Sequence, residues 1–447
     1  MAKKFFPKLL TVYCQETLIP CLSRATFATS NTMQKQTCKF LIAGGGTGGI
    51  TMASRILRLG EKDVTVIEPS ENHYYQPYWT LIGGQKKSLP DSCRPTSSVM
   101  PRGVNWVKDK IVEIDPLSNS VCTANGRKIE YSYLVVALGL HLAFEKIKGL
   151  PAAFESKGVC SNYSSQTVRK TAQALDDFVK GNAIFTQPVN PIKCAGAPQK
   201  IMYLAEEYFS KKGKRADANI IFNTALPTIF SCPKYAAALR EVAKSKNITV
   251  NYFHSLVEVK ADSKEAVFAK LNEKGKTIGT EIFPYEMLHV VPPMIAPSVI
   301  ANSPLADPTG FMDVHQNTLQ SMKFPNVFGI GDCINVPTSK TAAAVAAQCG
   351  VLTKNIKQVF KGKEIDHRYF GYTACPLVTG YNKGIMAEFN YKLEAVETLP
   401  INQAKERYIS YYMKKDLMPF IYWNLMLKGL WPGPGPVRKL LHLGFSS

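Results

Sequence analysis

The stretch "CKFLIAGGGTGGITMASRILRLGEKDVTVIEPS", residues 38–70, decides the fold of this chain. An apolar run at 40–43 leads into a cluster of glycines, apolar residues then recur at helical spacing, and a second apolar run at 64–67 ends in Glu68. Two short apolar runs on either side of a helical pattern predict parallel strands joined by a crossover helix. In that setting an acid at the end of the second strand is placed to accept hydrogen bonds from an adenosine ribose.

The glycines of this stretch have the G-x-G-x-x-G spacing of a dinucleotide-binding turn, with Gly44, Gly46 and Gly49 in the three positions. The first allows a tight turn, the second lets the backbone approach a pyrophosphate, and the third lets helix and strand pack closely. The N–H groups at the start of the following helix attract the phosphates. The strand, helix and acid around this spacing make a dinucleotide site a specific prediction rather than a chance match.

Length and composition are those of a folded soluble enzyme of two or three domains. The chain has 447 residues, of which 45% are hydrophobic and 20% are charged. Its apolar runs are all shorter than the roughly 20 residues that a membrane-spanning helix needs.

The net charge of +20 has two parts. Residues 1–39 carry six basic residues and one acid in a stretch rich in Ser and Thr, which predicts a mitochondrial transit peptide over residues 1–38. A basic tail without a targeting role is the alternative. Residues 40–447 keep 48 basic and 33 acidic residues, a net +15 that suits an anionic membrane surface or anionic substrates. No zinc-finger, helix-turn-helix or RNA-recognition signature is present, so no nucleic-acid partner is expected.

Eleven cysteines occur, an odd number with no C-x-x-C pair. This pattern excludes a secreted disulfide framework and a zinc site, so no metal is expected. Most of these thiols are expected to be small buried hydrophobes.

Two later segments indicate the cofactor. "YSYLVVALGL" (131–140) reads as a strand entering a small-residue turn, and "FPNVFGIGDCINVP" (324–337) as a strand ending at Asp332. Both resemble the signature stretches of the flavoproteins with two dinucleotide-binding domains, the family that contains glutathione reductase. The resemblance implies FAD, with Asp332 on the ribityl chain and the helix within 341–356 directed at the flavin ring, where its dipole stabilises a reduced flavin. A simple helix cap is the alternative role for Asp332.

A second Rossmann-like unit follows but lacks its nucleotide loop. We predict strands at 182–186, 219–224 and 248–253, with helices at 198–210 and 233–245 between them. The turn after the first strand, "QPVNPIKCAGAP", holds one glycine, three prolines and a cysteine, and proline has no N–H for a phosphate. The strand at 219–224 also ends without an acid. NAD(P)H is therefore not the expected electron donor.

Cys194 stands where that loop should be, and Cys375 lies in a second turn-like motif with a following proline. A thiol beside a flavin can relay electrons, and a thiolate reacts well with soft sulfur species. The start of the following helix and Lys193 are candidates to lower the pKa of Cys194. Inert packing is the alternative for each cysteine.

Five motifs together resemble the mitochondrial type of sulfide:quinone oxidoreductase: "KCAGAPQKIMYL" (193–204), "YTACPLVTGY" (372–381), "YYQPYWTLIGG" (74–84), "FGIGDC" (328–333) and "PTSKTAAAVAAQ" (337–348). The resemblance extends from about residue 39 to the C-terminus. It implies that Cys194 and Cys375 form a redox centre beside the flavin, where hydrogen sulfide leaves a persulfide on one of them. The sulfur then passes to a small acceptor such as glutathione or sulfite, and FAD passes two electrons to ubiquinone at the mitochondrial inner membrane.

The same resemblance carries FAD contacts over by position. The residues implied are Gly46 and Thr47 at the phosphates, Glu68 at the ribose, Ile111 at the adenine, Gln76 near the flavin, Asp332 at the ribityl chain and Lys340 at the flavin edge. Cys160 lies where some prokaryotic relatives have a third cysteine, and a structural role is expected for it here.

The C-terminal tail, predicted at 411–447, joins an apolar and aromatic run at 417–431 to a second short segment through a Pro-Gly hinge at 432–436. Apolar faces flanked by cations predict a monotopic membrane anchor, with Phe420, Tyr422 and Trp423 near a quinone entrance. Packing on the protein's own core or a dimer contact is the alternative.

The expected architecture is α/β, with two Rossmann-like domains and amphipathic C-terminal helices. FAD-binding segments at 39–165 and 321–410 enclose the second unit at 166–320. A type II NADH:quinone oxidoreductase shares this architecture but needs the second glycine loop. A non-catalytic flavoprotein, such as a redox sensor or scaffold, is the other alternative, although it needs neither thiol.

Overall fold

The computed structural model describes residues 35–443. The predicted transit peptide at 1–38 therefore lies outside the described residues, except for its last four positions. Those four begin the first strand, β1 (Lys35–Ala43), which starts ahead of the predicted domain boundary at residue 39.

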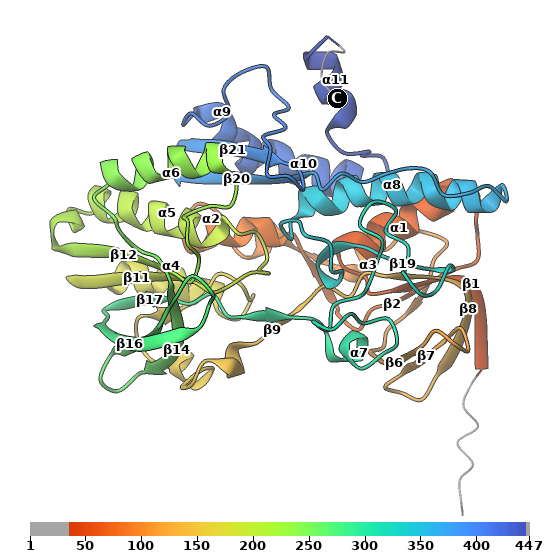
Figure 1. Cartoon of the computed structure of the whole chain (residues 1–447), viewed down its shortest axis with the longest axis horizontal. Coiled ribbons are helices and arrows are strands. Elements are labelled where there is room, and N and C mark those ends of the chain that lie inside the picture. The colour runs from red at the N-terminus through yellow and green to blue at the C-terminus, as the bar shows by residue number, and fades with distance from the viewer. Residues whose placement is uncertain (1–34, 444–447) are drawn as a thin grey trace, which may run out of the picture.

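The first sheet forms the right-hand body in Figure 1 and is built around the glycine-rich stretch. Its central strands are parallel, with β1 between β2 and β8, and β19 returns from far along the chain to pair with the end of β8. In spatial order the strands are β5 (Asn105–Val107), β2 (Val64–Ile67), β1, β8 (Lys128–Val136), β7 (Ser120–Thr123) and β6 (Ile111–Asp115), with β19 (Val327–Gly329) beside β8.

Helix α1 (Thr47–Arg58) makes the crossover between β1 and β2, as the apolar pattern predicted. The residues Phe40–Ala43 of β1 are fully buried because parallel strands are covered on both faces. Helix α8 (Ala342–Phe360) packs beside α1 above this sheet (Figure 1).

The second sheet, in the left-hand body of Figure 1, is wholly parallel. Its strands are β10 (Val159–Cys160), β17 (Met287–His289), β11 (Gly181–Gln187), β12 (Ala218–Thr224) and β13 (Thr249–Asn251). Helices α5 (Ala197–Lys211) and α6 (Pro233–Ser245) follow β11 and β12, so the predicted order of strands and helices in this unit is confirmed.

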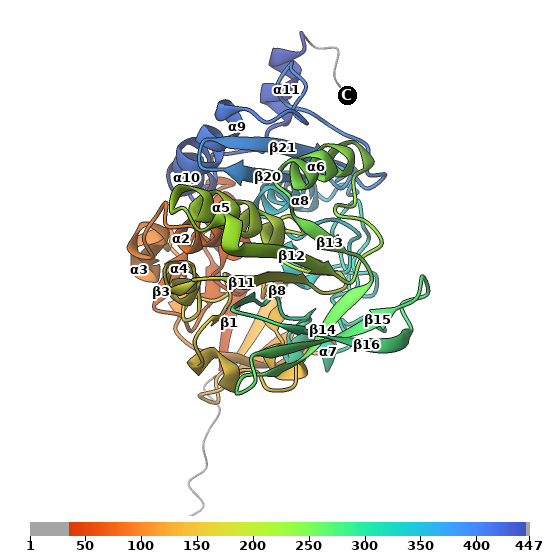
Figure 2. The same cartoon turned by 90° about the vertical axis from the view of Figure 1, so that its left-hand side faces the viewer.

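The chain joins this sheet at β10, ahead of the predicted boundary at residue 166, and leaves it at β17. The short pair β9 (His141–Leu142) and β18 (Met294–Ile295) links the two bodies. An antiparallel sheet lies below the second sheet (Figure 2), with strands β14 (His254–Lys260), β15 (Glu265–Leu271) and β16 (Thr277–Pro284).

A top layer spans both bodies in Figures 1 and 2. It contains α8, the hairpin β20 (Thr373–Gly380) and β21 (Lys383–Phe389), and the tail. Shorter elements complete the fold: β3 (Asn72–Tyr74), β4 (Cys93–Pro95), α2 (Trp79–Gly83), α3 (Thr96–Val99), α4 (Val168–Asp177) and α7 (Ser298–Ala301). The predicted fold class is confirmed.

The tail is helical from Tyr408 to Met426, through α9 (Tyr408–Tyr412), α10 (Met418–Ile421) and two π-helical turns at Met413–Leu417 and Tyr422–Met426, and again in α11 (Gly435–Leu441). One face packs on the protein's own core, where Tyr422 and Trp423 are buried, while Phe420 and Leu430 are exposed. Within residues 35–443, none of the helices has the length and apolar character needed to cross a bilayer.

Candidate functional site

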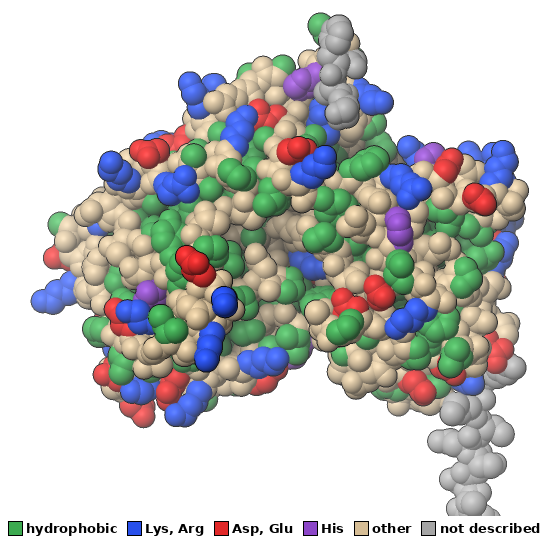
Figure 3. Space-filling view, in the orientation of Figure 1, with side chains coloured by type: hydrophobic (Ala, Val, Ile, Leu, Met, Phe, Trp, Pro, Cys, Tyr) green, Lys and Arg blue, Asp and Glu red, His purple; other side chains and the backbone are tan. Residues whose placement is uncertain are grey.

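An elongated cavity of about 520 Å³ runs between the first sheet, the turn after β11 and the tail. Its walls include the glycine loop at one side, Glu68 and Ile111 at one end, and Cys194 with Lys414 at the other. In the space-filling view, hydrophobic side chains gather around a hollow between the two bodies, and lysines and arginines are scattered over the rest of that face (Figure 3).

The glycine loop has the shape that an extended diphosphate ligand requires. Gly44 has a φ of +101°, and a Cβ there would lie 2.7 Å from the Ala137 carbonyl oxygen. A Cβ on Gly49 would lie 1.8 Å from the Gly44 carbonyl oxygen, so this glycine permits the packing of α1 against β1. A Cβ on Gly46 would meet no atom within 4 Å, which leaves this backbone open to the cavity.

At the predicted adenosine end, the Glu68 carboxylate is held by two backbone donors. Its Oε2 accepts from the N–H of Gly45 at 2.7 Å and its Oε1 from that of Ser70 at 2.8 Å. Ile111, the first residue of β6, is buried beside it and lines the cavity. These residues fit the ribose and the base of a dinucleotide.

At the middle of the cavity, Asp332 and Lys340 lie near the start of α8. The helix begins after Thr341, whose hydroxyl accepts from the N–H of Ala344 at 3.1 Å, and Thr341 and Ala342 line the cavity. The Lys340 ammonium donates to the Ile334 carbonyl. Burial lowers the pKa of Lys340, and Asp332 partly opposes that shift.

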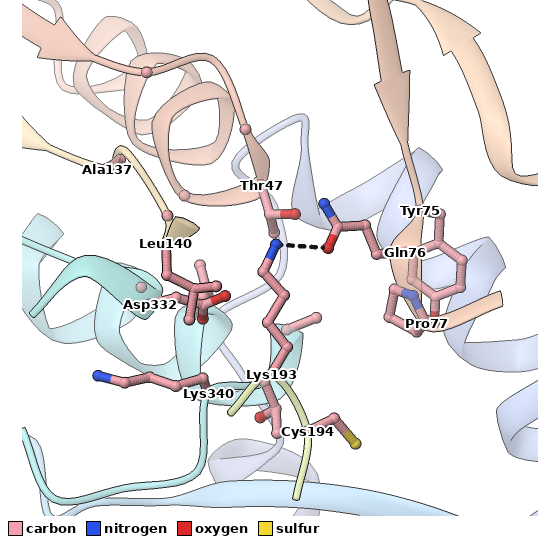
Figure 4. A pocket seen from close by; sticks show the side chains of 18 of the residues that line it. Thr47, Tyr75, Gln76, Pro77, Ala137, Leu140, Lys193, Cys194, Asp332 and Lys340 are labelled. Atoms are coloured by element: carbon pink, nitrogen blue, oxygen red, sulfur yellow. Dashed lines mark hydrogen bonds between the residues drawn. The ribbon is translucent and has the colours of Figure 1, made fainter. Parts of the chain in front are cut away.

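Figure 4 places Lys193 and Gln76 across the cavity from Asp332, with the Lys193 ammonium 3.1 Å from the Gln76 side-chain oxygen. The prediction that Lys193 lowers the pKa of Cys194 is wrong, because its side chain extends away from the sulfur toward Gln76 and Thr47. Figure 4 shows the side chains of Lys193 and Cys194 pointing in different directions from this turn.

The two predicted redox cysteines, 181 positions apart, meet at one end of the cavity. The Sγ atoms of Cys194 and Cys375 are 3.1 Å apart, a hydrogen-bonded dithiol contact. Cys375 lies on β20, and a Cβ on Gly196 would be 2.7 Å from its sulfur, so only glycine at that position admits the contact. Cys194 has a φ of +49°, and its N–H donates to the Lys340 carbonyl at 2.8 Å. That N–H is therefore engaged and cannot bind a phosphate.

The pKa values of the two thiols shift in opposite directions. The hydrogen bond from Cys375 and the Lys200 ammonium, whose Nζ is 3.1 Å from Sγ, hold the pKa of Cys194 well below its usual value although burial opposes the shift. The same hydrogen bond, together with burial, raises the pKa of Cys375. Cys194 is therefore the thiolate of the pair, and it lines the cavity while Cys375 is buried behind it.

The two cations near the sulfurs were not identified from the sequence. Lys200 is one residue among the apolar positions of α5, and only its helical register directs it at the turn before the helix. Lys414, from the tail, is 1% exposed, lines the cavity and donates to the Pro77 carbonyl. Burial lowers the pKa of Lys414 to about 7, and Lys200 adds to that shift. The sequence alone does not show that a lysine is buried, because burial depends on which elements pack around it.

Unpartnered polar groups support a polar ligand in this cavity. Asn162 and Tyr163 line it and are buried, yet the amide oxygen and nitrogen of Asn162 and the Tyr163 hydroxyl have no hydrogen-bond partner within the described residues. Buried polar groups are normally satisfied, so a bound molecule is expected to pair with some of them. The residues that surround the cavity therefore fit a dinucleotide with a polar ring system.

Three other buried cysteines differ from this pair. Burial raises the pKa of Cys160 to about 12, and its thiol donates weakly to the Leu288 carbonyl at 3.7 Å. Burial likewise raises the pKa of Cys333 and Cys349.

Phe420, Tyr422 and Trp423 were predicted near a quinone entrance, but of the tail it is Lys414 and Met418 that line the cavity.

Comparisons with known proteins agree with this geometry. A family model described as pyridine nucleotide-disulphide oxidoreductase matches residues 38–180. The mitochondrial sulfide:quinone oxidoreductase of Mus musculus is 55% identical over 407 residues, which is 91% of this chain and 90% of the mouse protein. That of Dictyostelium discoideum is 45% identical over 403 residues, 89% of this chain and 88% of that protein.

Among solved structures, the X-ray structure of the sulfide:quinone oxidoreductase from the hyperthermophilic bacterium Aquifex aeolicus superposes with a TM-score of 0.77. It covers 92% of this chain and 96% of the bacterial one at 18% sequence identity, which shows a shared fold.

Proposed function

This chain belongs to the mitochondrial sulfide:quinone oxidoreductases, a family of flavin-dependent enzymes, and we propose that it oxidises hydrogen sulfide and passes the electrons through FAD to a quinone. The observation that carries this proposal is the thiol pair. Cys194 and Cys375 lie 3.1 Å apart, with a lysine on the thiolate, at the end of a cavity that starts at a dinucleotide loop.

In this proposal FAD would lie in the cavity in one direction. Gly46 and the start of α1 at Thr47 would hold the pyrophosphate, and Asp332 would bind the ribityl chain. Glu68 would bind the adenosine ribose and Ile111 the adenine, so the ring system would lie toward Gln76, Lys340 and Cys194. When bound, the flavin accepts two electrons from the thiol pair and gives them to a quinone.

The chain's own residues supply the sulfur chemistry. In the oxidised state the two cysteines form a disulfide, and hydrosulfide attacks the Sγ of Cys375. The S–S bond breaks, Cys375 becomes a persulfide, and Cys194 leaves as a thiolate. Cys194 is the better leaving group because Lys200 and the neighbouring thiol stabilise its thiolate.

The persulfide then gives up its outer sulfur. A nucleophile such as glutathione or sulfite attacks that sulfur, and the S–S bond breaks to leave a Cys375 thiolate. The two thiolates close the disulfide again when they lose two electrons, so each turnover consumes one hydrosulfide and one acceptor and releases one proton and two electrons. Lys200 provides positive charge for these anionic reactants, and Lys414 adds to it below about pH 7.

The tail suits a quinone that resides in a lipid phase, such as ubiquinone in the mitochondrial inner membrane. Phe420 is 59% exposed and Leu440 is 76% exposed, and the cations Lys428 and Lys439 stand near them in the chain. Apolar side chains flanked by cations suit a monotopic membrane contact. Met418, two residues from Phe420, lines the cavity, so a quinone could reach the flavin from this side.

Anaerobic reduction of the purified flavoprotein tests the proposal. Sulfide is expected to bleach the flavin absorbance, and Cys194→Ser and Cys375→Ser are each expected to abolish that bleaching. NADH is the parallel donor, and bleaching by NADH alone would instead make the protein a nicotinamide-dependent quinone reductase. Flavin that neither donor reduces would indicate a scaffold or sensor. Quinone reduction is then followed with ubiquinone in lipid vesicles.

A further inference from the structure

The part of the tail from Tyr422 to Trp431 lies along the whole length of α1. The Leu427 carbonyl accepts from the Ser54 hydroxyl at 2.5 Å, the Lys428 carbonyl from Arg58 Nε at 2.7 Å, and the Trp431 carbonyl from Arg55. This contact begins at the first residue of the helix, Thr47, and continues to its last residue, Arg58.

Gly429 shows how close this approach is. It has a φ of +72°, and a Cβ there would lie 3.1 Å from the backbone nitrogen of Arg55. The tail backbone therefore packs directly on the helix backbone. Helix α1 is thus enclosed between the first sheet and the tail, and the tail covers the helix that begins at the dinucleotide loop.

At the loop itself, Tyr422 makes the contact. Its hydroxyl is 2.9 Å from the Thr47 hydroxyl and 2.6 Å from Nε2 of His73, and the ring is 2% exposed. The other ring nitrogen of His73 is 3.3 Å from the carbonyl oxygen of Gly45, within the glycine loop. Two residues of the loop, Gly45 and Thr47, are therefore joined through one histidine and one tail tyrosine.

The direction of these hydrogen bonds follows from the acceptor at one end. A carbonyl can only accept, so His73 donates from Nδ1 to Gly45. Burial lowers the pKa of His73 to about 4, so the ring is neutral near pH 7 and its Nε2 accepts from the Tyr422 hydroxyl. The Thr47 hydroxyl then donates to the Tyr422 oxygen. The three hydrogen bonds therefore all run in one direction, from Thr47 to Tyr422, from Tyr422 to His73 and from His73 to Gly45. They hold the side chain of Thr47, which lies at the cavity wall in Figure 4, in one orientation.

We propose that the tail segment 422–431 stabilises helix α1, which begins at the dinucleotide loop, by packing along it, and that Tyr422 is a positioning residue which holds Thr47 and the glycine loop in the conformation that binds FAD. This inference rests on the proposed function, because it takes FAD as the ligand of the loop. Docking of the tail on α1 and binding of the flavin are then linked equilibria: each stabilises the other by the same factor.

Flavin release from the holoenzyme tests the linkage, measured as the recovery of flavin fluorescence after dilution. Thr47→Val is expected to speed release about fivefold, the usual effect of losing one buried hydrogen bond, and Tyr422→Phe at least as much because it loses two. Both substitutions remove the bond between Thr47 and Tyr422, and Tyr422→Phe also removes the bond to His73, so the double variant should release flavin about as fast as Tyr422→Phe alone. A general structural weakness would instead give multiplied effects, so a double variant near the product of the two single effects overturns the proposal.

Tyr412→Phe is the matched control, since this tyrosine is on the same tail and is exposed. It should leave the release rate unchanged, and an unchanged rate in Tyr422→Phe would overturn the proposal. If Tyr422→Phe does not fold, Arg58→Met loosens the exposed end of the tail contact without touching the cavity. Faster release is expected there as well, and an unchanged rate overturns the linkage.

Hydrogen exchange provides the reciprocal measurement. Removal of the flavin should speed amide exchange in residues 422–431, and equal exchange in the two forms contradicts the linkage. The failure of the proposed function is distinguishable: a wild-type protein that binds flavin but is not reduced by sulfide leaves this inference standing. A wild-type protein that binds no flavin overturns both.

Discussion

Replacing Lys200 should raise the pKa of Cys194 by about 1 to 2 units. The Lys200 ammonium lies 3.1 Å from the Cys194 sulfur inside the protein, so it makes a charge-assisted hydrogen bond to the thiolate. Such a bond contributes about 1.5–3 kcal/mol, and one pKa unit corresponds to about 1.4 kcal/mol. Lys200→Met keeps the aliphatic stem and removes the charge.

The effect on reactivity is smaller than the effect on the pKa. At a pH below both pKa values, a rise of about 1.5 units lowers the thiolate fraction about 30-fold. The remaining thiolate is about 5-fold more nucleophilic, because nucleophilicity rises with the thiol pKa. Alkylation of Cys194 should therefore slow about 6-fold at a pH below both pKa values. At a pH above both, where the thiol is a thiolate in either protein, alkylation should instead be faster in Lys200→Met.

The assay is the pH dependence of alkylation in a Cys375→Ser background. Cys194 is then the one thiol left of the pair, and the serine hydroxyl replaces the thiol of Cys375 as the donor to it. Thiolate ultraviolet absorbance gives the same pKa independently. Lys211→Met is the matched control, because Lys211 is on the same helix, is exposed and pairs with Glu207. An unchanged Cys194 pKa in Lys200→Met would refute the reasoning, because it would show that Lys200 does not stabilise the thiolate.

Three further predictions concern the cavity and its loop. Burial lowers the pKa of Lys414 to about 7, so this lysine is charged below pH 7 and neutral above it. Since its charge favours the Cys194 thiolate, Lys414→Met should remove a limb near pH 7 from the alkylation profile, and a limb that persists contradicts this assignment. Glu68→Gln should weaken FAD binding by the apoprotein about tenfold in a fluorescence titration, because the carboxylate faces the adenosine end; equal affinity would remove it from the site. Gly49→Ala places a Cβ 1.8 Å from a backbone oxygen and should lower the free energy of unfolding by at least about 1–3 kcal/mol in urea. With both variants measured as apoproteins, Gly46→Ala, in the same loop but facing open space, should leave the free energy of unfolding unchanged, and equal losses in both variants would contradict the packing argument.

Several features of this protein follow from its sequence alone. The spacing of Gly44, Gly46 and Gly49 between two apolar runs predicts the first βαβ unit, because turn geometry and helical periodicity depend on residues close together in the chain. The prolines and the cysteine at 187–198 likewise exclude a phosphate loop in the second unit, since a missing N–H is a property of the residue itself.

The tertiary structure alone decided how the distant parts meet. Sequence placed Lys193 beside Cys194, but the turn directs Lys193 across the cavity and the register of α5 brings Lys200 to the sulfur instead. The tail was expected to serve a membrane surface, yet its buried face brings Lys414 into the cavity.

The same face of the tail covers α1, and Tyr422 contacts Thr47 at the start of that helix. A contact between residues hundreds of positions apart depends on how whole elements pack, and no local pattern in the chain records it. For the same reason, only the folded chain shows that Cys194 and Cys375 lie 3.1 Å apart.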